Sequence, residues 1–208
     1  RRHKLTTRQY QIERDQTIII ALDAGRLMTG RIGTETKFET ALHASLTLMS
    51  ASARAGDNCG LVVFGRRVRR YLPPKRGAEH LDAVLEALHD LEPEMVEPSY
   101  ARTFRFITAN TKKRAFVVVL TDLVDKDSSK ELIASLRLLR PRHLPLVATV
   151  GDRDLNLVVS EPPKDARAVF TQSAAEEIIH QRESALRLVE NIGGRSEEHT
   201  SELQSHSF

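Results

Sequence analysis

The sequence has few of the features that stabilise a chain covalently or hold it in a membrane. Cys59 is the one cysteine, so no disulfide can form within the chain, which fits a reducing compartment. The longest apolar runs, at 17–22 and 115–120, are far shorter than the roughly 18 residues that a transmembrane helix needs. These absences exclude a disulfide-bonded scaffold and leave an ordinary globular composition of 40% hydrophobic and 28% charged residues.

The sequence also lacks the short motifs of common catalytic and nucleotide-binding sites. It has no Gly-x-Ser-x-Gly elbow, no Walker phosphate loop and no complete Gly-x-Gly-x-x-Gly turn. Its eight histidines form neither a His-x-x-x-His nor a His-Glu-x-x-His pair, which are the spacings that place two zinc ligands on one helix face. We therefore expect none of the enzyme classes that depend on these motifs.

Positive charge gathers at the start of the chain. The net charge is +3, and five of the first 14 residues are Lys or Arg against one Glu. Such a segment can contact phosphate groups or an anionic membrane surface, or form a solvated edge strand or linker, and we favour the solvated segment. Because aromatic residues make up 5% and tryptophan is absent, side chains that stack on bases are scarce. Nucleic acid is therefore not an expected partner.

Segments of strand-like and helix-like apolar spacing alternate along the chain. Strands are predicted at 17–22, 61–64, 68–72, 115–121 and 144–150, the second and third forming a hairpin. Helices are predicted at 37–55, 81–91, 99–110, 128–139 and 173–191. This order predicts an α/β fold with a doubly wound, mostly parallel sheet and one hairpin edge strand.

Two end segments lie outside the domain predicted for residues 16–194. Residues 1–15 are mostly polar and β-leaning, and are expected to be the end of an upstream β-rich segment or a connector. Residues 195–208 lack the apolar periodicity of the preceding helix and resemble a translated DNA-sequencing adapter. We interpret them as a non-native tail. Because this tail stands where a closing strand should follow the last helix, the domain is predicted to lack its last strand.

An aspartate directly follows each of the two strongest predicted strands. Asp23 comes after 17–22 and Asp122 after 115–121. Ligands of open α/β sheets bind beyond the carboxyl ends of the strands, so both carboxylates are expected to face one crevice if the two strands are neighbours. Mg²⁺ binds through one or two carboxylates and keeps several waters. The pair therefore suits a divalent cation, unless both carboxylates cap turns or helix N-termini instead.

The residues around these aspartates resemble the metal-ion-dependent adhesion site of von Willebrand factor A domains. That site has Asp-x-Ser-x-Ser, then a Thr in a later loop and an Asp after a later strand. Here Gly25 and Leu27 stand at the two serine positions, Ser99 best fits the Thr position, and Asp122 follows Thr121. The resemblance implies a von Willebrand A-like, Rossmann-type fold. It also implies a degenerate metal site of Asp23, Ser99 and Asp122, with no firm cofactor and at most weak Mg²⁺ binding.

A more specific resemblance extends from about residue 5 to residue 194. Its strings are Arg8-Gln-Tyr10, Leu22-Asp-Ala-Gly-Arg-Leu-Met28, Gly56-Asp57, Leu72-Pro-Pro74 and Leu120-Thr-Asp-Leu123. In this order and spacing they resemble the domain of unknown function 58, a branch of the von Willebrand A-like superfamily. The resemblance implies membrane helices upstream of this sequence, a place at the cytoplasmic face of the cell membrane, and a MoxR-type AAA+ ATPase as partner. The client protein stays unidentified.

We therefore expect a non-enzymatic protein-interaction domain that helps such an ATPase in chaperone-like or cofactor-insertion assembly. The alternative is a Mg²⁺-dependent phosphotransferase or hydrolase that uses Asp23 as nucleophile. Related enzymes usually have a second carboxylate two residues after the nucleophile, where this chain has Gly25. The crevice can also serve as a docking surface without metal.

A second candidate surface is the basic hairpin. Arg66, Arg67, Arg69 and Arg70 lie in it, two on each face. They form either a docking patch for an acidic partner or a solubilising sheet edge, and we favour the edge.

Overall fold

A six-stranded sheet forms the centre of the protein in the computed structural model, which describes residues 16–123, 126–151, 153–191 and 195–199. The strand order is β5-β4-β1-β6-β7-β8. Neighbouring strands are parallel except for the β4–β5 hairpin. The bounds are β1 (Thr17–Asp23), β4 (Asn58–Phe64), β5 (Val68–Lys75), β6 (Phe116–Thr121), β7 (Leu144–Val150) and β8 (Arg195–His199). This confirms the predicted mostly parallel sheet with a hairpin edge strand.

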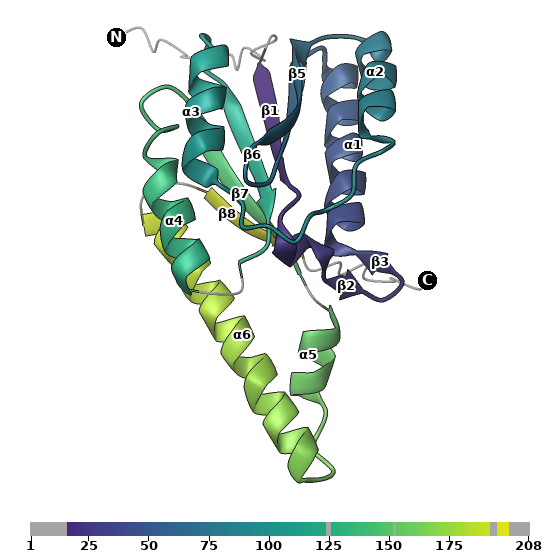
Figure 1. Cartoon of the computed structure of the whole chain (residues 1–208), viewed down its shortest axis with the longest axis vertical. Helices are drawn as coiled ribbons and strands as arrows, with labels where there is room; N and C mark the ends of the chain where they lie inside the picture. The colour runs from purple at the N-terminus through teal and green to yellow at the C-terminus, as the bar shows by residue number, and fades with distance from the viewer. Residues whose placement is uncertain (1–15, 124–125, 152, 192–194, 200–208) are drawn as a thin grey trace, which may run out of the picture.

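Helices cover both faces of this sheet (Figure 1). Because successive side chains of a strand point to opposite faces, Ile18 and Ile20 of β1 pack in one hydrophobic core and Ile19 and Ala21 in the other. This explains why the strand is apolar throughout residues 18–22. The first core is closed by α1 (Lys37–Ala55) and α2 (Ala78–Leu88), and the second by α3 (Tyr100–Asn110), α4 (Lys126–Leu136) and α6 (Ala166–Asn191).

Helix α1 begins with a reciprocal capping box. The Thr36 hydroxyl accepts from the Glu39 backbone N–H at 3.1 Å, and the Thr36 N–H donates to the Glu39 carboxylate at 2.6 Å. Such boxes satisfy backbone N–H groups that have no partner within the helix. A two-stranded ribbon of β2 (Arg31–Ile32) and β3 (Glu35–Thr36) leads into this cap. The cap fixes Lys37 as the first helical residue, and its side chain lies on the buried face of α1.

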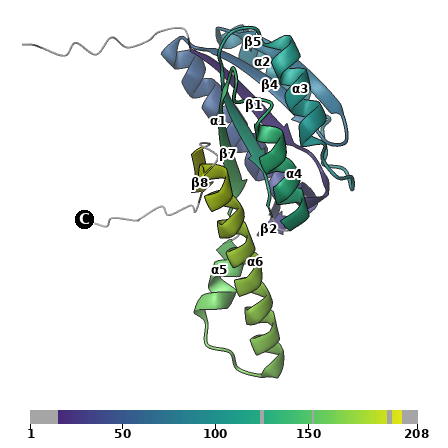
Figure 2. The same ribbon diagram turned by 90° about the vertical axis from the view of Figure 1, so that its left-hand side faces the viewer.

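A helical projection extends beyond the sheet in both views (Figures 1 and 2). It consists of α5 (Arg153–Ser160), which the sequence did not predict, and of α6, which begins at Ala166 rather than at residue 173. Phe170 is 77% exposed on it. Among the described residues, no helix is both long enough and apolar enough to cross a bilayer.

The predicted absence of a strand after the last helix is corrected by the structure. Residues 195–199 form β8, which pairs with β7 in parallel register from Leu146↔Arg195 to Val150↔His199. The physical reason is that β7 would otherwise leave a row of backbone N–H and C=O groups unpaired. Backbone groups make this pairing, so a segment without apolar periodicity can supply it. The non-native origin of the tail stays a prediction, and residues 1–15 and 200–208 lie outside the described part of the chain.

Candidate functional site

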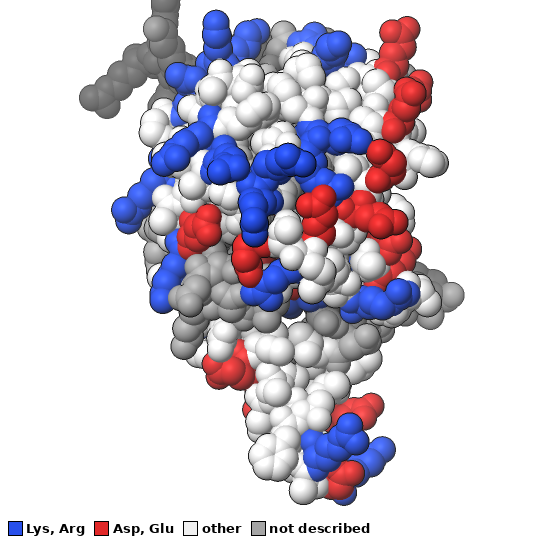
Figure 3. All heavy atoms as spheres, viewed as in Figure 1, with Lys and Arg blue, Asp and Glu red and all other residues white. Residues whose placement is uncertain are grey.

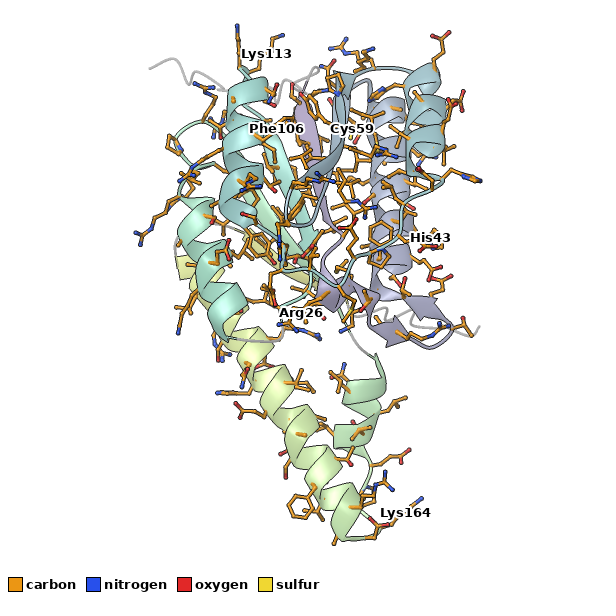
Figure 4. All side chains as sticks on the ribbon, in the orientation of Figure 1. Arg26, His43, Cys59, Phe106, Lys113 and Lys164 are labelled. Atoms are coloured by element: carbon orange, nitrogen blue, oxygen red, sulfur yellow. The ribbon has the colours of Figure 1, made fainter. Side chains whose placement is uncertain are left out.

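The two aspartates predicted as a pair lie at the ends of neighbouring strands. β1 and β6 pair in parallel from Ile18↔Phe116 to Leu22↔Leu120, so Asp23 and Asp122 both lie at the carboxyl end of the sheet. The exposed fractions of the two residues are 1% and 0%. Figure 4 shows this end of the sheet near Arg26, opposite the end marked by Lys113. The expected adjacency is confirmed, but both carboxylates are buried.

The Asp23 carboxylate is held by donors of the chain itself. Its Oδ1 accepts from the Gly25 N–H at 2.7 Å, and its Oδ2 accepts from the Thr121 hydroxyl at 2.6 Å. The Tyr100 hydroxyl lies 3.5 Å from Oδ2 and 2.9 Å from the Thr121 hydroxyl. Burial raises the pKa of Asp23 from 3.8 to about 6, although these hydrogen bonds favour the charged form. Burial also raises the pKa of Tyr100 well above its ordinary value, so the phenol keeps its proton.

The Asp122 carboxylate is held by two buried cations. Its Oδ2 lies 2.5 Å from Nζ of Lys37, and its Oδ1 lies 3.0 Å from Nη2 of Arg182. The Leu123 N–H also donates to Oδ1, at 2.9 Å. The side chains of Lys37 and Arg182 are 10% and 3% exposed. Helices α1 and α6 thus each contribute one positive charge to the same carboxylate.

Ser99, the third predicted ligand, lies immediately before α3. Its N–H donates to the Gly65 carbonyl at 2.9 Å, and its carbonyl accepts from the Thr103 hydroxyl at 2.9 Å. Its hydroxyl makes no capping hydrogen bond to α3. Within the described residues, no hydrogen bond joins that hydroxyl to Asp23 or Asp122. The side chain of this region that reaches Asp23 belongs to the next residue, Tyr100.

A loop segment closes the end of β1. The Glu94 N–H donates to the Ala24 carbonyl at 2.8 Å, and the Arg26 N–H donates to the Val96 carbonyl at 2.9 Å. A Cβ added at Gly25 would lie 2.9 Å from Cδ of Pro98, closer than such atoms approach in proteins. The glycine is therefore required by space, and no side chain at this position can supply a ligand oxygen without displacing the loop.

The residues present do not fit a divalent metal ion. Mg²⁺ and Ca²⁺ need several oxygen ligands with lone pairs directed at the ion. The two oxygens of Asp122 face an ammonium and a guanidinium group instead. Leu27 is a half-buried apolar residue of the short 3₁₀ helix η1 (Arg26–Thr29). Across the described ranges, no group of three or more His, Cys, Asp or Glu residues is placed to hold a metal ion.

Four residues of this cluster were not predicted as functional: Lys37, Tyr100, Thr121 and Arg182. A usable signal existed for two of them. Arg182 falls three and seven residues before Ala185 and Val189, which are buried on α6. Lys37 falls four residues before the buried Ala41. A cation on the apolar side of a helix indicates a buried anionic partner, because an unpaired buried charge is strongly unfavourable.

The basic hairpin is partly neutralised within the molecule. Nε of Arg69 lies 3.3 Å from Glu94, and Nη2 of Arg70 lies 3.0 Å from Asp90. Arg66 and Arg67 are exposed. Figure 3 shows Lys and Arg side chains gathered over the upper part of this face, with Asp and Glu along its right-hand edge. Two of the four hairpin arginines therefore have acidic partners within the molecule, and the preference for a solubilising edge stays a prediction.

The chain is similar to known proteins in sequence and in fold. Residues 1–188 match the family model described as "Protein of unknown function DUF58". The structure is similar to that of the conserved hypothetical protein BatB from Bacteroides thetaiotaomicron, with a TM-score of 0.50 and 17% identity over 65% of this chain and 67% of that chain. No curated protein matches the sequence.

Two further solved structures have similar scores. The SpRpn10 VWA domain has a TM-score of 0.49 and 16% identity, covering 77% of this chain and 82% of its own. An aerotolerance-related membrane protein from Bacteroides fragilis NCTC 9343 has a TM-score of 0.49 and 13% identity, covering 86% and 98%. At these identities the similarity concerns the fold alone.

Proposed function

The chain belongs to the DUF58 family of proteins of unknown function, and from this premise we propose that it is a non-enzymatic protein-interaction domain. The main support for the proposal is that Lys37 and Arg182, two cations of the domain itself, each contact one carboxylate oxygen of Asp122. A catalytic carboxylate must reach the proton or atom on which it acts. Neither Asp122 nor Asp23 is exposed, which favours a structural role for both and leaves the overlying surface for binding.

We place the docking surface over this end of the sheet. It consists of η1 and the segment 94–97 that crosses it. Met95 is 79% exposed there, and the half-buried Arg26 and the exposed Glu97 form an ion pair beside it. An exposed methionine is an adaptable apolar contact, and apolar centres with polar rims are typical of protein interfaces. A backbone hydrogen bond from Arg26 to Val96 joins the two parts of this surface.

The proposed partner is a MoxR-type AAA+ ATPase, with the domain presented at the cytoplasmic face of the membrane by a longer parent protein. This part of the proposal is supported by the DUF58 sequence resemblance. The role is to help the ATPase act on client proteins or insert metal cofactors. An ATPase supplies the chemical energy, so the domain itself needs no catalytic group.

A binding assay with matched surface variants tests the proposal. The parent protein is immobilised and its affinity for the cognate ATPase is measured. Met95→Glu is expected to weaken binding at least about 10-fold, because a charge then replaces an apolar contact at the interface centre. Leu157→Glu is the control, because Leu157 is 51% exposed on α5, outside the proposed docking surface. Equal binding by both variants, or no binding by the wild type, would contradict the proposal.

The enzyme alternative is tested separately. A phosphotransferase that uses Asp23 needs a carboxylate oxygen that its substrate can reach, whereas Asp23 is 1% exposed and both its oxygens accept hydrogen bonds within the domain. We therefore expect no hydrolysis of phosphate esters in the presence of Mg²⁺. Hydrolysis that disappears in Asp23→Asn, with the fold intact, would overturn the non-enzymatic assignment.

A further inference from the structure

The backbone of Lys37 is fixed at the start of α1, and its side chain reaches Asp122 from there. Its N–H donates to the Gly30 carbonyl at 2.7 Å, and the capping box of Thr36 fixes the same turn. A Cβ at Gly30 would lie 3.4 Å from Cε of Lys37, so the lysine stem already packs closely against this backbone. The methylene chain of Lys37 therefore has little conformational freedom, and its ammonium group is held against the Asp122 carboxylate.

Asp122 needs compensating charge because it has no access to water. Its exposed fraction is 0%, and a buried carboxylate without a cation is strongly unfavourable. Lys37 and Arg182 bring two positive charges, one to each carboxylate oxygen. Two is also the charge of the divalent cation that the two strand-end aspartates would suit.

We propose that Lys37 and Arg182 together replace a divalent cation at Asp122, making the carboxyl end of this sheet complete without metal. The missing side chain at Gly25 belongs to the same arrangement, because Pro98 and Val96 occupy the space that a ligand side chain would take. Leu27, at the other serine position of the adhesion-site pattern, likewise brings no ligand oxygen. The inference concerns the folded domain alone and holds whether or not the docking proposal does.

A fixed ammonium and a bound metal ion differ in what they offer to a partner. A metal ion with exchangeable waters can accept an oxygen from a docking protein. Lys37 has a side chain only 10% exposed and its short contact is directed inward to Asp122, so it offers little to an approaching ligand. Any binding at this end of the sheet is then insensitive to chelators.

The test removes both cations and asks whether a metal ion can replace them. The variants are Lys37→Met with Arg182→Met, and the same pair with Asp122→Asn. Thermal unfolding is followed in EDTA and in millimolar Mn²⁺, and Mn²⁺ uptake is followed by electron paramagnetic resonance. The wild type is expected to show no stoichiometric uptake and a midpoint that Mn²⁺ leaves unchanged.

The double variant is expected to unfold about 10 °C or more below the wild type in EDTA, and to regain part of this loss in Mn²⁺. The triple variant is expected to be more stable than the double variant, and Mn²⁺ is expected to leave its unfolding midpoint unchanged, because the amide introduced at position 122 needs no cation. If the double variant does not fold in EDTA, the readout is its folded yield when it is refolded with Mn²⁺ and the folding of the triple variant.

Three results would overturn the inference. The first is stoichiometric Mn²⁺ uptake by the wild type with a rise in its midpoint. The second is a double variant as stable as the wild type in EDTA. The third is a double variant that gains nothing from Mn²⁺. None of these measurements involves a partner protein, so they fail or succeed separately from the docking experiment.

Discussion

Arg182 of α6 and Asp122 at the end of β6 are joined by a buried ion pair of 3.0 Å. This pair ties the long helix of the α5–α6 projection to the centre of the sheet. Toward the distal end the projection has little support, as Lys164 at its tip in Figure 4 illustrates. The position of the projection therefore depends on contacts near the sheet, and the Arg182–Asp122 ion pair is one of them.

The first prediction concerns this pair. Arg182→Met should lower the free energy of unfolding by about 3 kcal/mol, because Asp122 loses one of its two buried cations. Amide hydrogen exchange in α6 should also rise. Arg187→Met is the control, because Arg187 is exposed and contacts Glu183 at 3.4 Å and Ser184 at 3.3 Å on its own helix, an arrangement that contributes little. Equal effects of the two substitutions would show that Arg182 has no special role.

The second prediction follows from the raised pKa of Asp23. Burial lifts it from 3.8 to about 6, so the folded state binds a proton more tightly than the unfolded state. This group therefore favours folding below pH 4, and its contribution is lost as the pH rises to 6. Asp23→Asn removes that dependence. Relative to the wild type, the variant should gain about 3 kcal/mol between pH 4 and pH 7.

Urea unfolding at several pH values measures this difference directly. Subtracting the wild-type curve from the variant curve removes the titration of the other carboxylates. A difference that stays constant from pH 4 to pH 7 would mean that Asp23 titrates normally in the folded protein.

The third prediction compares two buried threonines. The Thr121 hydroxyl donates to Asp23 at 2.6 Å, whereas the Thr149 hydroxyl has no hydrogen-bond partner among the described residues. Thr121→Val should cost about 2 kcal/mol, because a charged acceptor loses its donor. Thr149→Val should be neutral or stabilising, since an unsatisfied hydroxyl is replaced by a methyl group of similar size. The free energies of unfolding of the two variants test this prediction. A larger loss of stability in Thr149→Val than in Thr121→Val would contradict it.

The fourth prediction concerns the space above β1. Gly25→Ser should destabilise the domain by about 2 kcal/mol and create no Mg²⁺ site, because its Cβ would meet Pro98. Gly25→Ala should show a similar loss, since the Cβ and not the hydroxyl causes the clash. Calorimetric titration with Mg²⁺ checks the second point. Magnesium binding gained by the serine variant alone would show that the loop moves to admit a ligand.

Several features of this protein were determined by its sequence alone. The uniformly apolar runs at 17–22 and 115–121 predicted strands buried on both faces, and they are central neighbours in the sheet. Because a parallel sheet brings the carboxyl ends of its strands to one edge, the sequence also placed Asp23 and Asp122 together. Helix α1 was predicted within its observed bounds, because its apolar spacing and Gly56 mark the helix locally.

Other features were decided only by the tertiary structure. Nothing local to Asp122 shows that Lys37 and Arg182 reach it, because one comes from α1 and the other from α6. The closing strand β8 likewise forms by pairing with the open edge of β7, which no local pattern in residues 195–199 indicates. Apolar periodicity reports which face of an element is buried. The partner that a buried charge finds depends on how distant elements pack, and here that packing places two cations where the sequence suggested a metal ion.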